Sequence, residues 1–362
     1  MISIAKPLIG EAEKKAVAEV LDSGMIANGA IVTQFENEFA AYLGAKYAVA
    51  TTSGTTALEV ALRSLGIGNG DKVLTTPFSF IASTNAILYA GAAPVFADIL
   101  PDAFTIDPDA VEAALRADPT IKALLIVHLF GQACDMDRIM ALVDRYNLIL
   151  IEDCAQAHGA AWNGKPVGTF GDAGCFSFYP TKNMTTGEGG MVVTNREDLR
   201  DTAKLLINHG MKIRYHHDII GYNYRMTNIA GAIGLCQLKR LPEFNARRRA
   251  NAAELNRRIA NPRVVAPFVV PGSDHCFHQY SVLIEDGLRD EFTAFLNANE
   301  VGFGVFYPFT IPEQRCYASF GFRTDYPVSD RIKTQIVSLP VHPGLTSDEI
   351  AIVARVVNAF GA

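Results

Sequence analysis

One lysine, Lys182, stands just beyond a short apolar segment, residues 175–179, which Pro180 ends. Lysine is seldom fully buried, so a lysine in this position is most often a solvated loop residue. Its amine can also form a Schiff base with a carbonyl compound. The polar residues that the fold places around Lys182 decide between these two interpretations.

A second polar segment, Thr-Thr-Ser-Gly-Thr-Thr-Ala at residues 51–57, separates a predicted strand from a predicted helix. Small residues let the backbone approach an anion, and a helix N-terminus offers free N–H groups and a positive dipole. The segment therefore has the properties of a phosphate site. Alternatively, it is a capped helix start with Ser53 or Thr55 as the N-cap residue. The chain contains no Gly-x-x-x-x-Gly-Lys-Ser/Thr sequence, so this segment is not a P-loop.

A third polar segment, Glu-Asp-Cys-Ala-Gln-Ala-His at residues 152–158, follows the predicted strand at 148–151. Carboxylates at a strand end can bind a metal, a ribose or a protonated ring nitrogen, or can cap the next element. A metal ion would need more ligands at regular spacing, and His158 supplies one ligand nearby. We therefore predict no metal site.

Pyridoxal 5'-phosphate is the cofactor that suits all three segments. It needs a lysine for a Schiff base, an acid facing its pyridinium nitrogen and a phosphate site. The chain provides these in the order phosphate segment, acid, lysine, each at the end of a predicted strand. Ligands of an open α/β sheet bind at the carboxyl ends of its strands, so the three segments are expected to meet.

Short apolar runs alternate with helical periods between residues 45 and 195, which predicts a layered α/β domain with a mostly parallel sheet. The expected strands are 47–50, 71–74, 123–127, 148–151, 174–178 and 190–194, and the expected helices are 56–65, 81–89 and 136–146. Because no helix separates 174–178 from 190–194, we expect a mixed sheet.

Longer helical periods follow at 196–208 and 226–259. Beyond them we expect strands at 278–284 and 302–307 and helices at 289–299 and 347–360. Because strands and helices alternate again after the long helical periods, we predict a large domain of residues 1–250 and a smaller C-terminal α/β domain of residues 251–362.

Charge and cysteine usage exclude other protein classes. The net charge of −6 is spread along the chain, and the basic cluster 247–249 lies in a predicted helix, where we expect a solvated face. Nucleic-acid binding is therefore not expected. The six cysteines stand apart in mostly apolar surroundings, which favours a reducing compartment. The N-terminal segment has no apolar signal core and no apolar run is long enough for a membrane span, so we expect a cytoplasmic protein without membrane contact.

Several motifs resemble those of the DegT/DnrJ/EryC1/StrS family, the sugar aminotransferases of PLP fold type I. The similar segments are TTSGTTALEVAL, DMDRIMAL, IEDCAQAHGA, FSFYPTKN, GEGG, HGM and GYNYRMTNIAGAIG, and the resemblance extends from the N-terminus to 337–340. It implies the fold type I architecture, with a mixed, mostly parallel sheet between helices and a smaller C-terminal α/β domain.

The resemblance also implies a role for each site residue. Lys182 would carry the Schiff base, and Asp153 would face the pyridine N–H, where a carboxylate stabilises the pyridinium. Gln156 would bind the 3-hydroxyl, and Phe80 would stack on the ring. The phosphate would meet Gly54, Thr55, Ser177 and, from the other subunit of a homodimer with shared active sites, Asn223.

The reaction implied is amino transfer from L-glutamate to a nucleotide-linked ketosugar. Dehydratases of the family have histidine where this chain has Lys182, which favours aminotransfer. Two alternatives remain: the same chemistry on a cyclitol ketone or aminobenzoate precursor, and a non-catalytic PLP-binding regulator.

The acceptor is not identified by the sequence. Relatives often have a Tyr-Pro-x-Pro-x-His pattern, but this chain has Pro312 where that histidine is common. A second polar cluster precedes the GYNYRM segment and either meets a diphosphate across the dimer interface or is an exposed loop. It contains His209, Arg214, His216 and His217.

Overall fold

A seven-stranded sheet forms the centre of the protein, whose computed structural model describes residues 1–361. The strand order is β1-β9-β8-β5-β4-β2-β3. The strands are β1 Tyr47–Thr51, β2 Lys72–Thr75, β3 Ala93–Phe96, β4 Ile121–Val127, β5 Ile149–Asp153, β8 Ala173–Ser177 and β9 Gly190–Thr194. All neighbours pair in parallel except β9, which is antiparallel to both β1 and β8. The expected mixed, mostly parallel sheet is confirmed.

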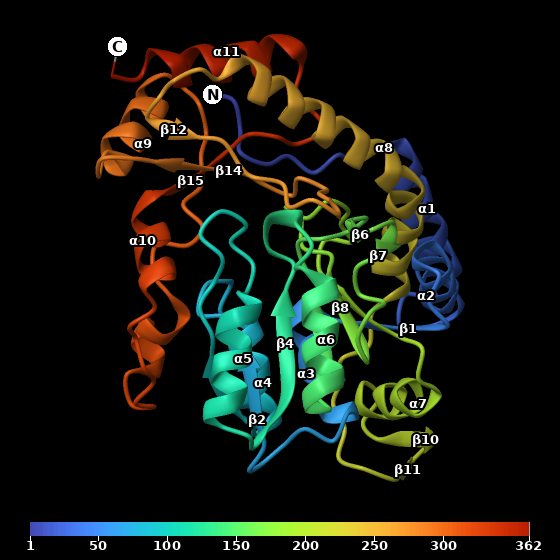
Figure 1. Ribbon diagram of the computed structural model, residues 1–362. Helices are drawn as coiled ribbons and strands as arrows, with labels where there is room; N and C mark the ends of the chain where they lie inside the picture. The colour runs from blue at the N-terminus through green and yellow to red at the C-terminus, as the bar shows by residue number, and fades with distance from the viewer. Residues whose placement is uncertain (362) are drawn as a thin grey trace.

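Helices cover both faces of this sheet. The larger helices are α1 Glu11–Ser23, α2 Ala30–Leu43, α3 Gly54–Ser64, α4 Ala82–Ala90, α5 Pro108–Ala117, α6 Met136–Tyr146, α7 Glu197–Leu206 and α8 Asn228–Arg258. One apolar core joins the sheet to α2, α5, α6 and α8, and a second joins it to α3, α4 and α7. Figure 1 shows α5 and α6 on the near side of β4, with α3 behind it. Since both faces are covered, strands such as β4 are apolar throughout rather than alternating.

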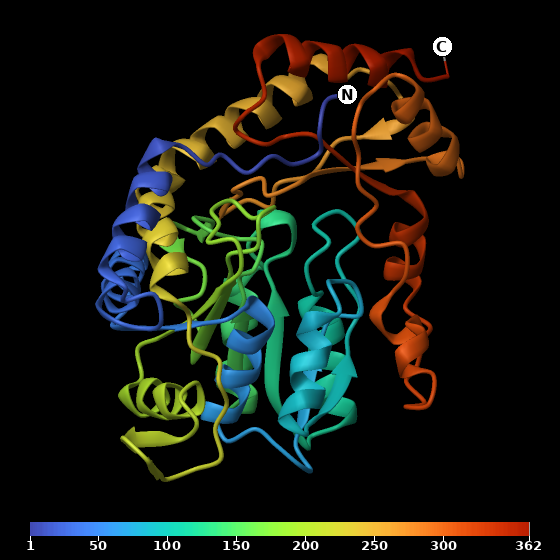
Figure 2. The ribbon, with the colours of Figure 1, turned by 180° about the vertical axis from the view of Figure 1, so that it is seen from behind.

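The C-terminal part lies above the carboxyl ends of the parallel strands (Figures 1 and 2). It contains α9 Arg289–Ala298, α10 Pro327–Gln335, α11 Ser347–Ala359 and the antiparallel sheet of β12 Val264–Val265, β14 Tyr280–Ile284 and β15 Ile336–Leu339. Its apolar core also includes side chains from the end of α8 and from Ile2. Helix α8 is continuous through residue 250 and so contributes to both parts of the chain.

Two small sheets complete the structure. They consist of β10 Met211–Ile213 with β11 His216–His217, and of β13 Ser273–Asp274 with β6 Ala161–Trp162 and β7 Lys165–Pro166. Among the described residues no helix has the length and hydropathy of a membrane span.

The expected strand at 302–307 is wrong. Gly302 donates its N–H to the Ile2 carbonyl, and Gly304 exchanges two backbone hydrogen bonds with Ser338 of β15. A Cβ on Gly302 would lie 2.7 Å from the Ile2 carbonyl oxygen. The segment therefore passes from one neighbour to another and forms two isolated bridges, not a continuous ladder.

Strand β3 was not expected because it is short and contains Pro94. It lies at the edge of the sheet, where a residue without an N–H is tolerated. Its position is decided by pairing with β2, which an apolar pattern of four residues does not reveal.

Candidate active site

A cavity of about 580 Å³ lies between the carboxyl ends of the central strands and the C-terminal part. Seven of the predicted site residues line it: Gly54, Thr55, Phe80, Asp153, Gln156, Ser177 and Lys182. They come from α3, the segment before α4, β5 and the segment after it, and β8 and the segment after it. The fold thus brings together four separate segments of the chain.

The N-terminus of α3 forms one end of the cavity. Ser53 is the N-cap residue, and its hydroxyl accepts the Thr56 N–H at 3.2 Å. The Thr56 hydroxyl in turn accepts the Ser53 N–H at 3.0 Å. The first N–H groups of a helix have no acceptor inside the helix, so those of Gly54 and Thr55 remain available for an anion. The two interpretations of this segment are therefore compatible: it is a capped helix start and it faces a cavity.

Close packing explains the glycine in this turn. A Cβ on Gly54 would lie 2.6 Å from the Cβ of Ser177. A Cβ on Gly190 would lie 2.2 Å from the Ser53 carbonyl oxygen. Both contacts are too short, so α3 can approach β8 and β9 only because these two positions lack side chains.

Asp153 ends β5 and is almost fully buried. One carboxylate oxygen accepts the Ser83 hydroxyl at 2.8 Å, and the other accepts the Ala155 N–H at 3.0 Å. Burial raises the pKa of Asp153 above its ordinary value, although these two hydrogen bonds and the nearby Lys182 oppose the change. The Asp153 carboxylate can therefore stabilise the protonated ring nitrogen of a ligand bound next to it.

Lys182 lies in the turn after β8, where its backbone N–H donates to the Tyr179 carbonyl. Its side chain is half-buried in the cavity. Burial lowers the pKa of Lys182 to about 8, while the Asp153 carboxylate acts in the opposite direction. About a tenth of the amine is consequently uncharged at pH 7 and can react with a carbonyl group.

Gln156 is oriented by two hydrogen bonds. Its Oε1 accepts the Phe130 N–H at 2.8 Å, and its Nε2 donates to the Tyr307 hydroxyl at 3.0 Å. The second Nε2 proton remains free for a ligand. The rings of Phe80 and Tyr307 lie 6.2 Å apart at the same cavity, and Phe80 is 56% exposed. An exposed aromatic face at a cavity suits stacking on a flat ring.

These residues fit pyridoxal phosphate as a set. The helix terminus offers N–H donors for the phosphate, and the missing Cβ of Gly54 leaves the backbone accessible. Asp153 has no basic hydrogen-bond partner among residues 1–361, so its charge is free to meet a protonated ring nitrogen. Lys182 provides the amine.

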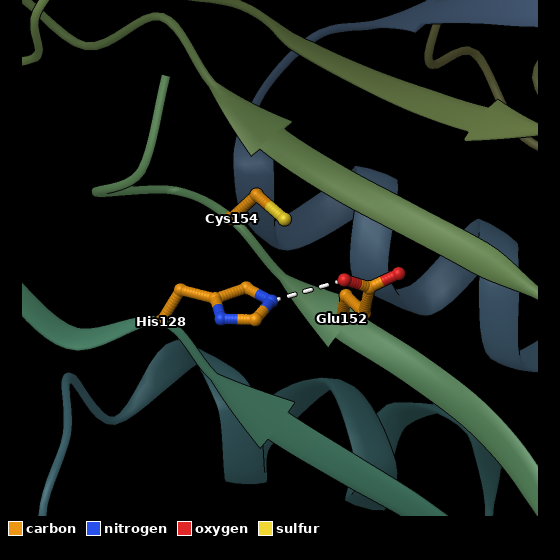
Figure 3. Close-up of side chains that lie close together, drawn as sticks. All are labelled: His128, Glu152 and Cys154. Atoms are coloured by element: carbon orange, nitrogen blue, oxygen red, sulfur yellow. Dashed lines mark hydrogen bonds and ion pairs between the residues drawn. The ribbon is translucent and has the colours of Figure 1, made fainter. Parts of the chain in front are cut away.

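His128, Glu152 and Cys154 lie close together and are buried (Figure 3). The Glu152 carboxylate accepts N–H groups from His128, Gly168, Phe170 and Gly171, at 2.7 to 3.0 Å. The Nδ1 of His128 accepts the Cys134 N–H at 3.1 Å, so its Nε2 carries the proton that Glu152 accepts. Each carboxylate oxygen of Glu152 already accepts two hydrogen bonds. These bonds connect β5 to the residue after β4 and to the loop before β8.

Asn223 does not line the cavity of its own chain. It is exposed, and its backbone forms a bridge with Asn208. The polar cluster that precedes it lies on the exposed hairpin of β10 and β11, where His217 Nδ1 lies 2.8 Å from the His209 carbonyl oxygen. The hairpin lies at the opposite end of the sheet from the C-terminal part (Figure 1).

Several residues that line the cavity are not among the predicted site residues. Ser83 lies in the first turn of the predicted helix 81–89, directly after Phe80, and this position near a predicted site residue could have indicated it. Tyr307, Arg248 and His278 come from the C-terminal half, and no local pattern connects them to Lys182. The cluster 247–249 is not a uniformly solvated face, because Arg247 is exposed and pairs with Glu243 whereas Arg248 is 4% exposed. Successive helical residues point about 100° apart, so one of the three faces inward.

The model of the DegT/DnrJ/EryC1/StrS aminotransferase family matches residues 7–359. This chain belongs to that family. It is 40% identical to the GDP-perosamine synthase of Caulobacter vibrioides over 96% of this chain and 95% of the relative. It is 37% identical to a UDP-N-acetyl-3-dehydro-alpha-D-glucosamine 3-aminotransferase of Acidithiobacillus ferrooxidans over 94% and 92% of the two chains.

Solved structures of family members share the fold. DesV of S. venezuelae, in complex with a ketimine intermediate, superimposes with a TM-score of 0.92 at 37% identity and covers 96% of this chain and 93% of its own. The PLP-form of the putative sugar aminotransferase Spr1654 of Streptococcus pneumoniae gives 0.93 at 28% identity over 99% and 97%. The expected aminotransferase fold and cofactor type are thereby confirmed.

Proposed function

We propose that this protein is a pyridoxal-phosphate-dependent aminotransferase that transfers the amino group of L-glutamate to a nucleotide-linked ketosugar in amino-sugar or deoxy-sugar biosynthesis. The observation that carries the proposal is the common cavity of Lys182, Asp153 and the α3 N-terminus, in a chain of the aminotransferase family. A regulator without turnover would not need the complete set of Lys182, Asp153 and Gln156 at one cavity.

We assign the residue roles from the geometry. The α3 N–H groups and Ser177 bind the phosphate, Asp153 holds the ring N–H proton and Gln156 Nε2 donates to the 3-hydroxyl. When bound, pyridoxal phosphate supplies an electron sink for negative charge at the donor Cα. Lys182 then moves a proton away from that Cα with its Nζ, which requires an uncharged amine. Phe80 and Tyr307 shield the ring from water.

The acceptor class follows from chemistry that the two named relatives have in common. One is named for a GDP-linked amino sugar, and the other for a UDP-linked 3-dehydro sugar that is aminated at carbon 3. Both products carry an amine on a sugar carbon, which amino transfer makes from the corresponding ketone. A comparison of keto-sugar nucleotides as acceptors identifies the nucleotide and the ring carbon.

The test is a pair of half-reactions followed by absorbance. L-Glutamate should remove the visible absorbance of the bound cofactor and release one equivalent of 2-oxoglutarate per site. Keto-sugar nucleotides should then restore the absorbance. If a cyclitol ketone or an aminobenzoate precursor restores the absorbance instead, that compound class is the acceptor. If glutamate gives no response, the aminotransferase proposal is refuted and a regulator is favoured.

We also propose a homodimer with shared active sites. Asn223 is exposed and lies outside the cavity of its own chain, so it is free to complete the phosphate site of another subunit. The neighbouring hairpin and the segment after it expose the large apolar side chains of Ile213, Tyr215 and Ile220, which are 67%, 75% and 87% exposed. Apolar exposure of this extent suits a surface that a second subunit covers.

Two organisational proposals accompany this function. We keep the division into a large part of residues 1–250 and a small part of residues 251–362, with α8 shared between them; the separate C-terminal core supports it. We place the protein in the cytoplasm, because its six cysteines are all free and four of them are buried.

A further inference from the structure

His278 presents an unpaired ring nitrogen to the active-site cavity. The residue lies just before β14, is 6% exposed and is the one histidine among residues 1–361 that lines this cavity. Its Nδ1 lies 3.1 Å from Asn183 Oδ1, whereas its Nε2 has no hydrogen-bond partner in the described chain. Both ring nitrogens of His158 are enclosed by protein atoms, but His278 Nε2 is not enclosed in this way. It is therefore open to a molecule in the cavity.

The hydrogen bonds of Asn183 determine which nitrogen of His278 carries the proton. The Asn183 Nδ2 donates to Asn245 Oδ1 at 2.8 Å and to the Cys276 carbonyl at 3.2 Å. A backbone carbonyl can only accept, so the amide nitrogen faces Cys276 and the amide oxygen faces His278. Because that oxygen also can only accept, the His278 Nδ1 carries a proton. In a neutral imidazole, Nε2 then has a free lone pair.

The surroundings of His278 keep its ring neutral. Burial lowers the pKa of His278 well below its ordinary value, and the positive charges of Lys182 and Arg248 lower it further. The neighbouring His158 and His275 act in the same direction. In the described chain no carboxylate is paired with the ring. His278 Nε2 is therefore a hydrogen-bond acceptor and not a donor.

A neutral acceptor restricts which ligand groups it can bind. Ionised carboxylates and phosphates have acceptor oxygens only, so they find no donor at His278 Nε2. The protonated ring nitrogen of the cofactor is assigned to Asp153, and the donor amino group must face the cofactor that receives it. The Lys182 amine lines the same cavity but forms no hydrogen bond with His278. Among the groups of the two substrates and the cofactor, the hydroxyls of the acceptor sugar remain as hydrogen-bond donors for Nε2.

We propose that His278 Nε2 accepts a hydrogen bond from a hydroxyl of the ketosugar, on a carbon next to the one that is aminated. This inference rests on the proposed function, because it assumes a ketosugar as the second substrate. Asn183 is next to Lys182 in the chain and fixes the His278 ring relative to the turn that carries the lysine. Since Lys182 acts at the carbon that receives the amine, the hydroxyls within reach of His278 are those close to this carbon.

This assignment gives the two half-reactions different requirements. L-Glutamate brings two carboxylates into the cavity, and the ketosugar brings hydroxyls. A charged side chain at position 278 would attract or repel the carboxylates, whereas a neutral acceptor has little effect on them. His278 should therefore matter mainly for the half-reaction with the sugar.

The first test uses the unaltered holoenzyme. The keto-sugar nucleotide that restores the absorbance is compared with its analogues in which a hydroxyl next to the ketone carbon is replaced by hydrogen. We expect one analogue to react with a second-order rate constant that is lower by about tenfold or more, because it leaves a buried acceptor unpaired. Rate constants equal to that of the full sugar would overturn the inference without any variant.

The second test compares His278→Phe with His275→Phe. His275 is a matched control, because it is also 6% exposed and has a lowered pKa but does not line the cavity. His278→Phe should lower the rate constant for the full sugar about tenfold more than the rate constant for L-glutamate. It should also react equally with the full sugar and the deoxy analogue, since the partner of the hydroxyl is gone.

Two further comparisons complete this test. His275→Phe should keep the preference for the full sugar. His278→Gln, whose amide oxygen can accept a hydrogen bond, should retain part of the preference. If His278→Phe does not fold, the comparison of the full sugar with the deoxy analogue in His278→Gln replaces it, and an unreduced preference there would refute the inference.

The outcomes separate the inference from the proposed function. Equal losses with the sugar and with L-glutamate in His278→Phe would indicate a purely structural histidine and refute the inference. A preference for the full sugar that persists in His278→Phe would assign the hydroxyl to another group and refute it as well. If no keto-sugar nucleotide restores the absorbance of the unaltered protein, the proposed function fails and this inference fails with it.

Discussion

Burial shifts the pKa values of Lys182 and Asp153 in opposite directions, and each shift suits its proposed task. Burial favours the uncharged form of both groups, so it lowers the pKa of the amine and raises that of the acid. Asp153 moderates the change at Lys182 because a nearby carboxylate stabilises the ammonium form. The two residues therefore act as a coupled pair.

The pKa of Lys182 predicts how cofactor binding depends on pH. Only the uncharged amine attacks the aldehyde, so below a pH of about 8 the rate of reconstitution of the cofactor-free protein should fall by about tenfold per pH unit and above it should level off. Asp153→Asn should move the midpoint to lower pH, because it removes the charge that raises the Lys182 pKa. Stopped-flow absorbance measures the rate, and an upward movement of the midpoint would contradict the coupling.

Asp153→Asn should also slow the reaction with L-glutamate by about 10²-fold or more, since an amide stabilises a pyridinium poorly. The fold should persist because the amide oxygen can still accept one of the two hydrogen bonds. Ser83→Ala is the control: it removes a neutral donor to Asp153 and should cost less than about tenfold. Single-turnover rates and thermal midpoints check both variants, and a native rate in Asp153→Asn would exclude Asp153 as the ring partner.

At the scale of elements, the N-terminus of α3 depends on two independent features. Ser53 caps the N-terminus of the helix, and the absence of a side chain at Gly54 permits contact with β8. Gly190 of β9 supports the same turn from behind, next to the Ser53 carbonyl. Stability and anion binding at this turn should therefore respond to different substitutions.

Ser53→Ala and Gly54→Ala separate these two features. Ser53→Ala should lower the free energy of unfolding by about 1 kcal/mol, the usual loss for an N-cap. In Gly54→Ala the new Cβ lies 2.6 Å from Ser177 and displaces the helix end, which should weaken cofactor binding by about tenfold or more. Denaturant unfolding and cofactor titration measure the two effects. Native cofactor affinity in Gly54→Ala would show that the helix end does not hold the phosphate.

At the scale of the whole molecule, one chain encloses most of the proposed site but leaves Asn223 outside. The C-terminal part covers the cavity, whereas Asn223 belongs to the exposed segment between β11 and α8. If Asn223 acts, it acts on another subunit. Activity would then depend on assembly.

Mixed dimers test this dependence. A Lys182→Ala chain paired with an Asn223→Ala chain should contain one site with both defects and one site with Lys182 and Asn223 intact. The heterodimer should therefore regain about half the activity of the unaltered dimer, measured after its composition is confirmed by mass. If Asn223 acts within its own chain, mixing should give no more than the average of the two parents.

Local sequence predicted the chemistry proposed for the site. Lys182, Asp153 and the segment around Gly54 could be recognised because each occupies a strand end, and in an open α/β sheet strand ends meet at one edge. The alternation of strands and helices likewise predicted a mixed, mostly parallel sheet, and the missing helix between β8 and β9 marked where the parallel order ends. These features depend on neighbouring residues in the chain, which is why they could be predicted.

Only the tertiary structure decided what covers the site. The C-terminal part folds over the strand ends and so brings three more residues to the cavity, Arg248, Tyr307 and His278. No periodicity of the sequence predicts these contacts. The segment 302–307 fails to form a strand for the same kind of reason, since its backbone pairs with residue 2 and with β15 in turn. Contacts between segments far apart in the chain depend on packing. For the same reason, the basic cluster 247–249 on α8 contains one arginine, Arg248, that faces inward and is buried.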